Sequence, residues 1–175
     1  MSYATTTIPS PVGPLALVAS PTGLVAVLWE NDSPTRVSLP SLQPDASNPI
    51  LKMAEEQLAA YFKGTLTAFT IPLHVHGTPF QQQVWQALRS IPYGETRSYA
   101  HIAHQLGAPT ATRAVGAANG KNPLSIIVPC HRVVGATGSL TGFAGGLPAK
   151  QFLLNHESLH TLSTTGLGLQ PMASV

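Results

Sequence analysis

The hydrophobic pattern of this chain changes character at residues 74–77, and that change limits the folds open to it. Before this point, β-prone apolar runs at residues 14–19 and 24–29 are separated by a turn that contains Pro and Gly. After it, apolar residues recur at the spacing of three and four that is typical of helices. The sequence therefore predicts an α+β protein with two successive units, residues 1–76 and 77–162.

The first unit is predicted to contain a β-hairpin, a loop, a helix and a further strand. Residues 31–49 are rich in Pro, Ser, Asn and Asp, which predicts a long loop. From Ile50, apolar residues keep helical spacing up to Gly64, and a short strand is expected at about residues 67–75. The residues expected to face the core from this helix are Leu51, Ala54, Leu58 and Tyr61.

The second unit opens with a strong helix start. Thr78 is a capping residue, Pro79 takes the first helical position and Gln81 the third, which is the pattern of a capping box. A Pro- and Gly-containing segment then predicts the end of the helix after Ile91.

Two shorter helices are predicted next. Ser98 can cap the first of them and Gly107 can end it, and a short turn leads to another helix at about residues 110–119. Two short helices joined by a tight turn are typical of a helix-turn-helix, although helical hairpins that bind no DNA are also common. Residues 163–175 are small and polar, and we expect them to form a flexible tail.

Cys130 is the only cysteine in the 175 residues, so it can form neither an internal disulfide nor a multi-thiolate metal site. A cysteine has an ordinary pKa of about 8.5, so a nucleophilic one needs a base, a cation or a helix N-terminus. His131 follows it directly, and Glu157 lies near the end of the last predicted helix. A Glu–His–thiol relay would fit, because the carboxylate would fix the imidazole tautomer. On spacing alone, a buried structural cysteine remains the alternative.

A glycine-rich segment follows the cysteine. Residues 135–146 contain five glycines, which would let backbone amides approach a ligand closely. A flexible surface loop is the other interpretation. The Gly-Lys-Ser/Thr ending of a phosphate-binding P-loop is missing.

Charge is distributed unevenly between the two units. Residues 1–76 carry three basic and five acidic side chains, whereas residues 77–175 carry six basic and two acidic ones. The net charges are therefore −2 (3 − 5) and +4 (6 − 2). A basic half that also holds the cysteine suits a polyanionic partner, with chance asymmetry as the alternative.

Several other classes of protein are disfavoured. No apolar run reaches the roughly 18 residues of a membrane span, and the first residues do not form a secretory signal. We therefore expect a cytoplasmic protein with no membrane partner. Solvated faces explain the paired histidines His74 and His76, and His101 and His104, better than metal binding does. No metal and no cofactor is expected.

Taken together, these residues resemble the O6-alkylguanine-DNA alkyltransferases, also called methylated-DNA–protein-cysteine methyltransferases. The resemblance extends from Phe80 to Glu157 and centres on Pro129, Cys130, His131 and Arg132. The other matching blocks are residues 80–85, 91–96, 98–99, 113–116, 119–123, 142–146 and 153–157. The resemblance implies a small RNase H-like N-terminal domain, followed by a mainly helical domain with a helix-turn-helix and the active-site cysteine.

The resemblance also implies a reaction. Cys130 would accept the alkyl group of O6-alkylguanine in DNA, irreversibly and once per molecule, after the base is flipped out of the duplex. His131 would deprotonate the thiol through a water, Glu157 would polarise that histidine, and Asn122 would brace the active-site turn. O4-alkylthymine is a further candidate substrate.

The implied partner is double-stranded DNA, bound through its minor groove by a monomer. Arg113 would fill the gap left by the extruded nucleotide, and Tyr99 would crowd its phosphate and donate a proton toward the ring. The further DNA contacts are assigned to Ala100 and Gly116, and the base pocket to Tyr99, Val133, Phe143 and Ala144.

The chain departs from some relatives in two ways. Its first half has no cysteine, so the structural zinc of some members is not expected, and Phe143 stands where others carry Tyr. Two other functions compete with alkyl transfer. A non-catalytic protein that recognises alkylated guanine is disfavoured by the presence of Cys130, and a cysteine hydrolase is disfavoured by the paired helices and Arg113.

Overall fold

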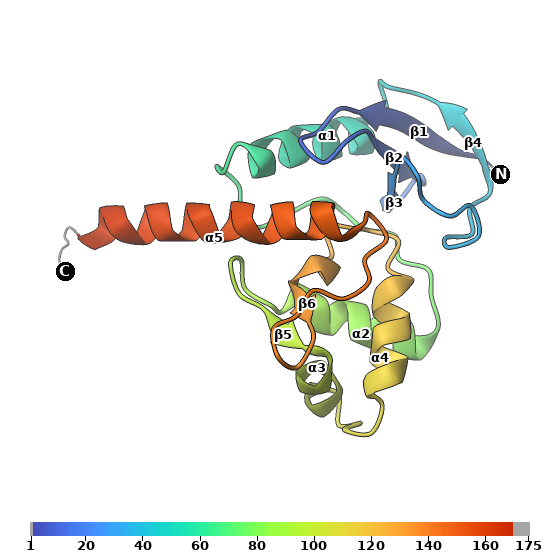
Figure 1. The fold of residues 1–175 in the computed structure, drawn as a ribbon. Helices are drawn as coiled ribbons and strands as arrows, with labels where there is room; N and C mark the ends of the chain where they lie inside the picture. Colours follow the sequence, from blue (N-terminus) through green and yellow to red (C-terminus); the bar gives the residue numbers. More distant parts are fainter. Residues whose placement is uncertain (1, 170–175) are drawn as a thin grey trace.

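The strand-forming first unit builds a four-stranded sheet (Figure 1). The computed structural model describes residues 2–169, with side chains up to residue 161. Strand β2 (Leu15–Ala19) lies between β1 (Ser2–Ile8) and β3 (Leu24–Trp29) and runs antiparallel to both. Strand β4 (Ser41–Pro44) pairs with β1 in parallel, so the order across the sheet is β3-β2-β1-β4.

Helix α1 (Pro49–Phe62) follows the sheet and packs against it. The side chain of Asn48 caps the helix by accepting hydrogen bonds from two backbone amides of the first turn. The chain leaves the helix through Gly64, whose φ of +81° suits glycine. All four residues predicted to face the core are buried: Leu51, Ala54, Leu58 and Tyr61.

Two predictions for the first unit were wrong. The expected loop at residues 31–49 contains β4, whose four residues are all exposed and so carry no hydrophobic pattern. In the described structure, residues 67–75 do not form the expected strand. This segment forms a single bridge, between Leu24 and Leu73, because the chain touches the edge of β3 only briefly.

Helix α2 (Pro79–Arg89) begins where the capping signal placed it. The Thr78 hydroxyl accepts from the amide of Gln81 at 3.1 Å, and the Gln81 side chain accepts from the amide of Thr78 at 3.0 Å. The predicted capping box is therefore confirmed.

A helix-turn-helix follows, formed by α3 (Tyr99–Gln105) and α4 (Thr112–Gly120). Ser98 caps α3 through the amide of His101 at 3.0 Å, as predicted. Gly107 adopts a φ of +73° just beyond α3, which confirms the predicted helix end.

The cysteine lies in a tight turn beyond α4. The turn is the 3₁₀ helix η1 (Cys130–Arg132), and strand β6 (Val133–Val134) continues from it and pairs in parallel with β5 (Arg97–Ser98). A glycine-containing loop then leads to the long helix α5 (Leu147–Leu169), which lies between the sheet unit and the helix-turn-helix (Figure 1).

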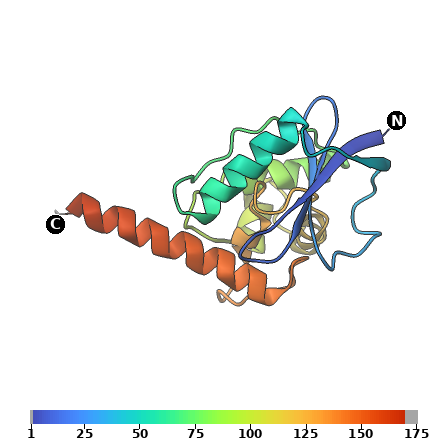
Figure 2. The same cartoon turned by 90° about the horizontal axis from the view of Figure 1, so that it is seen from above.

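Helix α5 includes the first seven of the residues 163–175 for which the sequence predicts a flexible tail. The helix continues to Leu169 and extends past the body of the molecule (Figures 1 and 2). No proline interrupts the chain between Pro148 and Pro171, and extending a helix that has already formed costs little. Residues 170–175 lie outside the described part. No helix in that part is long and apolar enough to cross a membrane.

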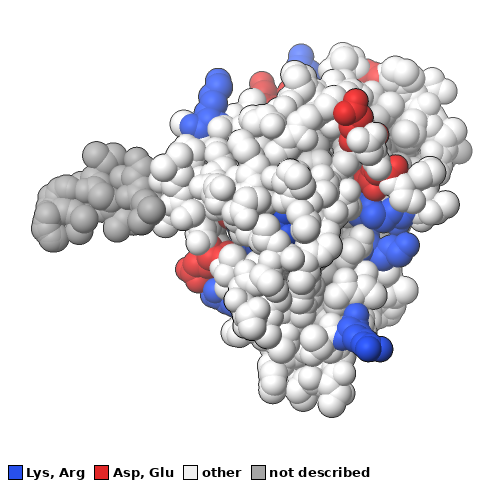
Figure 3. Space-filling view, in the orientation of Figure 1, with Lys and Arg blue, Asp and Glu red and all other residues white. Residues whose placement is uncertain are grey.

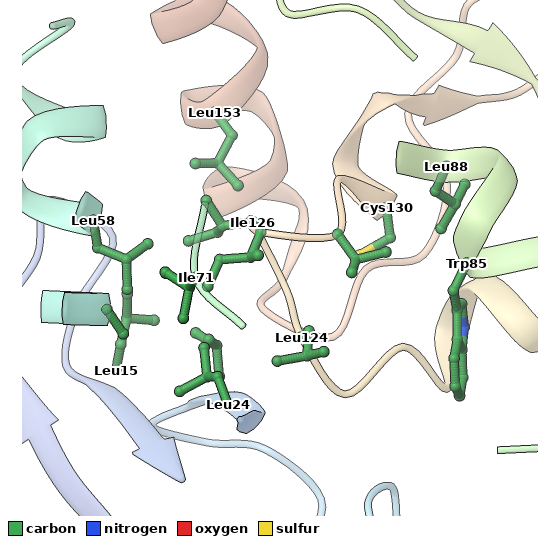
Figure 4. Packing of buried hydrophobic residues seen from close by; sticks show 14 of the residues in the cluster. Leu15, Leu24, Leu58, Ile71, Trp85, Leu88, Leu124, Ile126, Cys130 and Leu153 are labelled. Carbon is green, nitrogen blue, oxygen red and sulfur yellow. The ribbon is translucent and has the colours of Figure 1, made fainter. Parts of the chain in front are cut away.

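Both units contribute to one hydrophobic core. Leu24 of β3, Leu58 of α1 and Leu153 of α5 belong to the same cluster as Leu124 and Cys130 (Figure 4). The thiol is therefore embedded in the core of the molecule, where apolar burial stabilises the surrounding segment.

Backbone hydrogen bonds cover the outer edge of β3, and one of them joins the two units. The amide of Leu24 donates to Pro72 at 2.8 Å, and the amide of Val27 donates to Pro123 at 2.8 Å. The first bond covers the edge with the end of the first unit, and the second covers it with the loop that leads to Cys130.

Candidate active site

The loop before Cys130 reverses direction at a strained residue. Ile126 has a φ of +75°, a value that β-branched residues rarely adopt. The amide of Ile127 donates to the carbonyl of Ser125 at 2.9 Å and closes a three-residue turn around it. Such strain persists only where neighbouring contacts hold it in place.

Asn122 supplies those contacts. Its side-chain amide donates to the carbonyl of Val128 at 2.8 Å, and its carbonyl oxygen accepts from the amide of Leu124 at 3.0 Å. The Asn122 side chain therefore links the start of the loop to its end. Arg36 adds a contact from the first unit, because its guanidinium donates to the backbone carbonyl of Asn122 at 2.7 Å and pairs with Asp32 at 2.6 Å.

Cys130 is 4% exposed and lies at the start of η1. Burial raises the pKa of its thiol, against the opposing effects of Asn122, Arg36 and Lys150. The resting group at neutral pH is therefore the thiol, and a nucleophilic role requires a base.

His131 is placed to be that base. Its Nε2 donates to Glu157 Oε2 at 2.7 Å, and both side chains are buried. Because a carboxylate can only accept, Nε2 carries the hydrogen and the Nδ1 lone pair is available. Nδ1 has no hydrogen-bond partner within the described residues. Burial lowers the pKa of His131, with Glu157 opposing this, so the ring is neutral and can accept a proton.

Glu157 is an ionised group despite being 1% exposed. Arg132 donates to both carboxylate oxygens, at 2.8 and 3.0 Å, and the amide of Gly94 donates at 3.2 Å. Burial favours the neutral carboxyl, but the hydrogen bonds from His131 and Arg132 and the charge of Arg132 outweigh it and hold the pKa of Glu157 well below its usual range. The carboxylate can therefore orient His131 at every physiological pH.

Sequence reasoning missed three groups of this site. Arg132 was noted only as part of the motif, because its burial and its pairing with Glu157, 25 positions away, are visible only in the folded structure. Lys150 is fully buried and donates to the carbonyl of Val133 at 2.7 Å, and burial lowers its pKa. Tyr61 was predicted as a core residue, but its hydroxyl donates to Glu157 at 2.7 Å. No local pattern links residues 96 positions apart.

The residues predicted to form the base pocket come from α3, β6 and the loop before α5. The hydroxyls of Tyr99 and Thr141 are 2.6 Å apart. The ring of Phe143 packs edge-on against Trp29 of β3, with centroids 5.4 Å apart. Val133 is fully buried in β6, and Ala144 is half-buried in the loop before α5.

The predicted DNA-contacting residues lie on α3 and α4. Arg113 and Ala100 are exposed, whereas Gly116 is half-buried, near the ring of Tyr99. The exposed positions of α4 are Thr112, Arg113, Ala114, Ala117 and Gly120. This face therefore combines small side chains with a single arginine.

Part of the positive charge of the second unit is internal. Arg132 and Lys150 are buried, so two of the six basic side chains counted in the sequence are not displayed to a partner. Most of the face seen in Figure 3 is uncharged, with scattered Lys and Arg. Among residues 2–169, no cluster of three or more His, Cys, Asp or Glu side chains could hold a metal ion.

Comparisons with known families cover both units. Residues 79–159 match the model of the DNA binding domain of 6-O-methylguanine DNA methyltransferase, and residues 3–75 match that of its ribonuclease-like domain.

Curated relatives share about half of their residues with this chain. The methylated-DNA–protein-cysteine methyltransferase of Mycolicibacterium paratuberculosis is 51% identical over 156 residues, covering 89% of this chain and 92% of the relative. The protein of the same name from Mycobacterium tuberculosis is 52% identical over 153 residues, covering 86% and 90%.

Solved structures agree with these relatives. The crystal structure of Mycobacterium tuberculosis OGT in complex with DNA matches with a TM-score of 0.82 and 49% identity, covering 91% of this chain and 94% of that one. An O6-methylguanine-DNA methyltransferase from Pyrococcus kodakaraensis matches with a TM-score of 0.52 at 21% identity, covering 89% and 98%, which shows a shared fold.

Proposed function

The chain belongs to the methylated-DNA–protein-cysteine methyltransferase family, and we propose that Cys130 is the acceptor that removes the alkyl group from O6-alkylguanine in DNA. The chain is thus an enzyme of DNA repair by alkyl transfer. The observation that carries the assignment of Cys130 is its place in the core, one residue before a histidine that is hydrogen-bonded to a buried carboxylate.

The first step is the activation of the thiol. The available lone pair of His131 Nδ1 takes the proton of Cys130 through an intervening water, while Nε2 remains bonded to Glu157. Glu157 stays ionised and stabilises the imidazolium that forms. Burial disfavours a free thiolate, so proton transfer accompanies attack rather than preceding it.

The second step is a displacement at carbon. The sulfur of Cys130 forms a bond to the alkyl carbon, and the bond from that carbon to guanine O6 breaks with its electron pair left on the base. The base then gains a proton, so the thiol hydrogen has in effect replaced the alkyl group. The product is a thioether, and no group in the site can cleave it. Each molecule therefore reacts once.

The target base must leave the duplex to reach a buried thiol. Flipping a nucleotide costs a few kcal/mol, and contacts with the opened DNA must compensate for it. Arg113 would occupy the vacated position, and the small exposed face of α4 would lie against the minor groove. Tyr99, Val133, Phe143 and Ala144 would line the base pocket, and Ala100 and Gly116 would add DNA contacts.

Residues 1–76 and 77–162 would act as two domains of a monomer. The first supplies the sheet that supports the active-site loop, and the second supplies the helix-turn-helix and the thiol. O4-alkylthymine in DNA is a further substrate that the same displacement could serve.

The test is a stoichiometric transfer assay. A duplex oligonucleotide with one O6-methylguanine should restore guanine in a 1:1 ratio with protein, and peptide mass spectrometry should place one methyl group on Cys130. Cys130→Ser should abolish transfer and retain DNA binding. An unmodified Cys130 thiol after repair, or several repair events per protein, would refute the proposal.

A further inference from the structure

Tyr61 connects the first unit directly to the proposed catalytic relay. It lies in the last turn of α1, is fully buried, and its hydroxyl donates to Glu157 Oε2 at 2.7 Å. The same oxygen accepts from His131 Nε2 at 2.7 Å. Oε2 of Glu157 therefore accepts three hydrogen bonds, from the Tyr61 phenol of the sheet unit, from the proposed base His131, and from Arg132 at 3.0 Å.

The position of Tyr61 is held from several directions. Nε2 of His156 donates to its backbone carbonyl at 2.7 Å. The rings of Phe62 and Phe69 lie with their centroids 5.2 and 5.6 Å from that of Tyr61. Burial, reinforced by the nearby Glu157, raises the pKa of Tyr61 far above its usual value, so the phenol stays protonated and always donates.

We propose that Tyr61 is a positioning residue of alkyl transfer, whose hydrogen bond to Glu157 limits how strongly that carboxylate holds the proton on His131. The inference rests on the proposed function of His131 as the base. It gives the N-terminal unit a part in setting the reactivity of Cys130, in addition to supporting the loop.

The physical basis is competition for one oxygen. A hydrogen bond to a charged group stabilises that charge, so the phenol leaves less negative charge on Oε2 for the imidazolium. Removing the hydroxyl should raise the proton affinity of His131. The other titratable or charged groups around the relay are Cys130 and Arg132 of η1, Lys150 and His156 of α5, Tyr93 of the loop before β5, and Arg36 of the first unit.

Tyr93 provides a matched control for this hydrogen bond. Its ring lies 6.2 Å from that of Tyr61, and the Arg132 guanidinium lies 5.7 Å from its centroid. Its hydroxyl is buried and has no hydrogen-bond partner within the described residues. Tyr93→Phe thus removes a phenol hydroxyl from the same neighbourhood without removing a hydrogen bond to Glu157.

The experiment measures the rate of Cys130 alkylation by free O6-benzylguanine as a function of pH. A protonated His131 cannot accept the thiol proton, so the rate falls on the acid side. Tyr61→Phe should shift the midpoint of this acid limb to higher pH by about 0.5 unit. At pH values below the midpoint, the alkylation rate should then be about threefold lower than in wild type. Tyr93→Phe should follow the wild-type profile.

A second variant keeps the proposal testable if Tyr61→Phe folds poorly. Site-specific 3-fluorotyrosine at position 61 keeps the ring and makes the phenol a stronger donor, so the acid limb should move downward. A purely structural role of Tyr61 predicts altered thermal stability with unchanged pH profiles. Profiles that superimpose on wild type, or that move in the same direction in both variants, would overturn the proposal.

The same profiles measured with iodoacetamide separate this inference from the proposed function. Iodoacetamide reports the reactivity of the Cys130 thiol without a guanine leaving group. If wild-type protein reacts with iodoacetamide but takes no benzyl group from O6-benzylguanine, the proposed function fails. The iodoacetamide profiles of the two Tyr61 variants still decide whether Tyr61 controls His131.

Discussion

The residues of the proposed relay and those assigned to the base pocket differ in burial and packing. In the relay, His131, Arg132 and Glu157 are buried, and their hydrogen bonds to one another measure 2.7–3.0 Å. Among the residues assigned to the base pocket, Tyr99 and the loop at residues 141–146 are mostly half-buried or exposed, and the loop contains three glycines.

This difference fits the roles proposed for the two groups of residues. A buried carboxylate and guanidinium tolerate low dielectric only when both are fully paired, so the relay must be rigid. A pocket for a flipped nucleotide must instead admit a large group and release it, which glycines permit. The proposed mechanism thus assigns the chemistry to the tightly paired, buried residues and the recognition of the base to the glycine-containing loop.

The largest effect is expected from neutralising the relay. Glu157→Gln should slow alkyl transfer by about 10²–10⁴-fold, because His131 loses the charge that stabilises its imidazolium. It should also lower the free energy of unfolding by about 3–5 kcal/mol, because Arg132 stays buried without a counter-charge. Single-turnover kinetics and urea denaturation measure the two effects.

Glu95 offers the matched control for that variant. Its carboxylate pairs with Arg97 at 2.9 Å, but the two side chains are 52% and 30% exposed. Glu95→Gln should change stability by less than about 1 kcal/mol and leave the transfer rate unchanged. If Glu95→Gln and Glu157→Gln lose equal transfer rate and equal stability, the buried carboxylate contributes no more than an exposed ion pair does.

A smaller, substrate-dependent effect is expected from a residue assigned to DNA contact. Arg113→Ala should slow repair of duplex DNA by about tenfold, equivalent to about 1.4 kcal/mol, because nothing fills the vacated position in the stack. Reaction with free O6-benzylguanine should be unchanged, since no stack has to be opened. Parallel single-turnover assays check this, and equal slowing with both substrates would argue against the role of Arg113.

Two glycines of the loop at residues 141–146 should differ in how well they tolerate a side chain. A Cβ on Gly145 would lie 2.6 Å from the ring of Trp29, whereas a Cβ on Gly142 would meet nothing within 4 Å. Gly145→Ala should therefore cost about 1–3 kcal/mol of stability, and Gly142→Ala less than about 0.5 kcal/mol. Thermal melts of both variants compare a glycine packed against Trp29 with one that has open space around it. Equal melting temperatures would mean that the loop shifts to accommodate a side chain at either position.

Acidification should lower the free energy of unfolding in two stages. The pKa of His131 and that of Glu157 are both lower in the folded protein, so the unfolded chain binds more protons as pH falls. Stability should decline first below about pH 6.5 and further below about pH 4.3, and level off only below the folded pKa values. The expected loss is about 1 kcal/mol over the first unit of acidification. Urea denaturation from pH 8 to pH 4 checks this, and constant stability over that range would contradict it.

Local signals in the sequence predicted much of the helical unit. The capping box at Thr78, the cap at Ser98 and the helix end at Gly107 depend on residues only a few positions apart, so they could be identified without the fold. The structure also brings His131 within hydrogen-bonding distance of Glu157, as the resemblance implied. The catalytic roles of these two residues stay predictions.

Features that depend on contacts distant in sequence escaped prediction. Strand β4 exists because β1 offers a partner, not because its exposed residues form a pattern. The positive φ of Ile126 contradicts its local preference and depends on bonds made by Asn122. The hydroxyl of Tyr61 meets Glu157 only after both units have folded.

The covered edge of β3 has a consequence for how the chain must be made. An unpaired strand edge is a template for association with other chains. In this protein the edge is closed by Pro72 and by Pro123, and Pro123 is followed closely by the thiol-bearing turn. A nascent chain that has emerged only as far as residue 76 has Pro72 available, but the part of the edge at Val27 stays open to association with other chains. Protection from aggregation is completed by the same loop that presents Cys130.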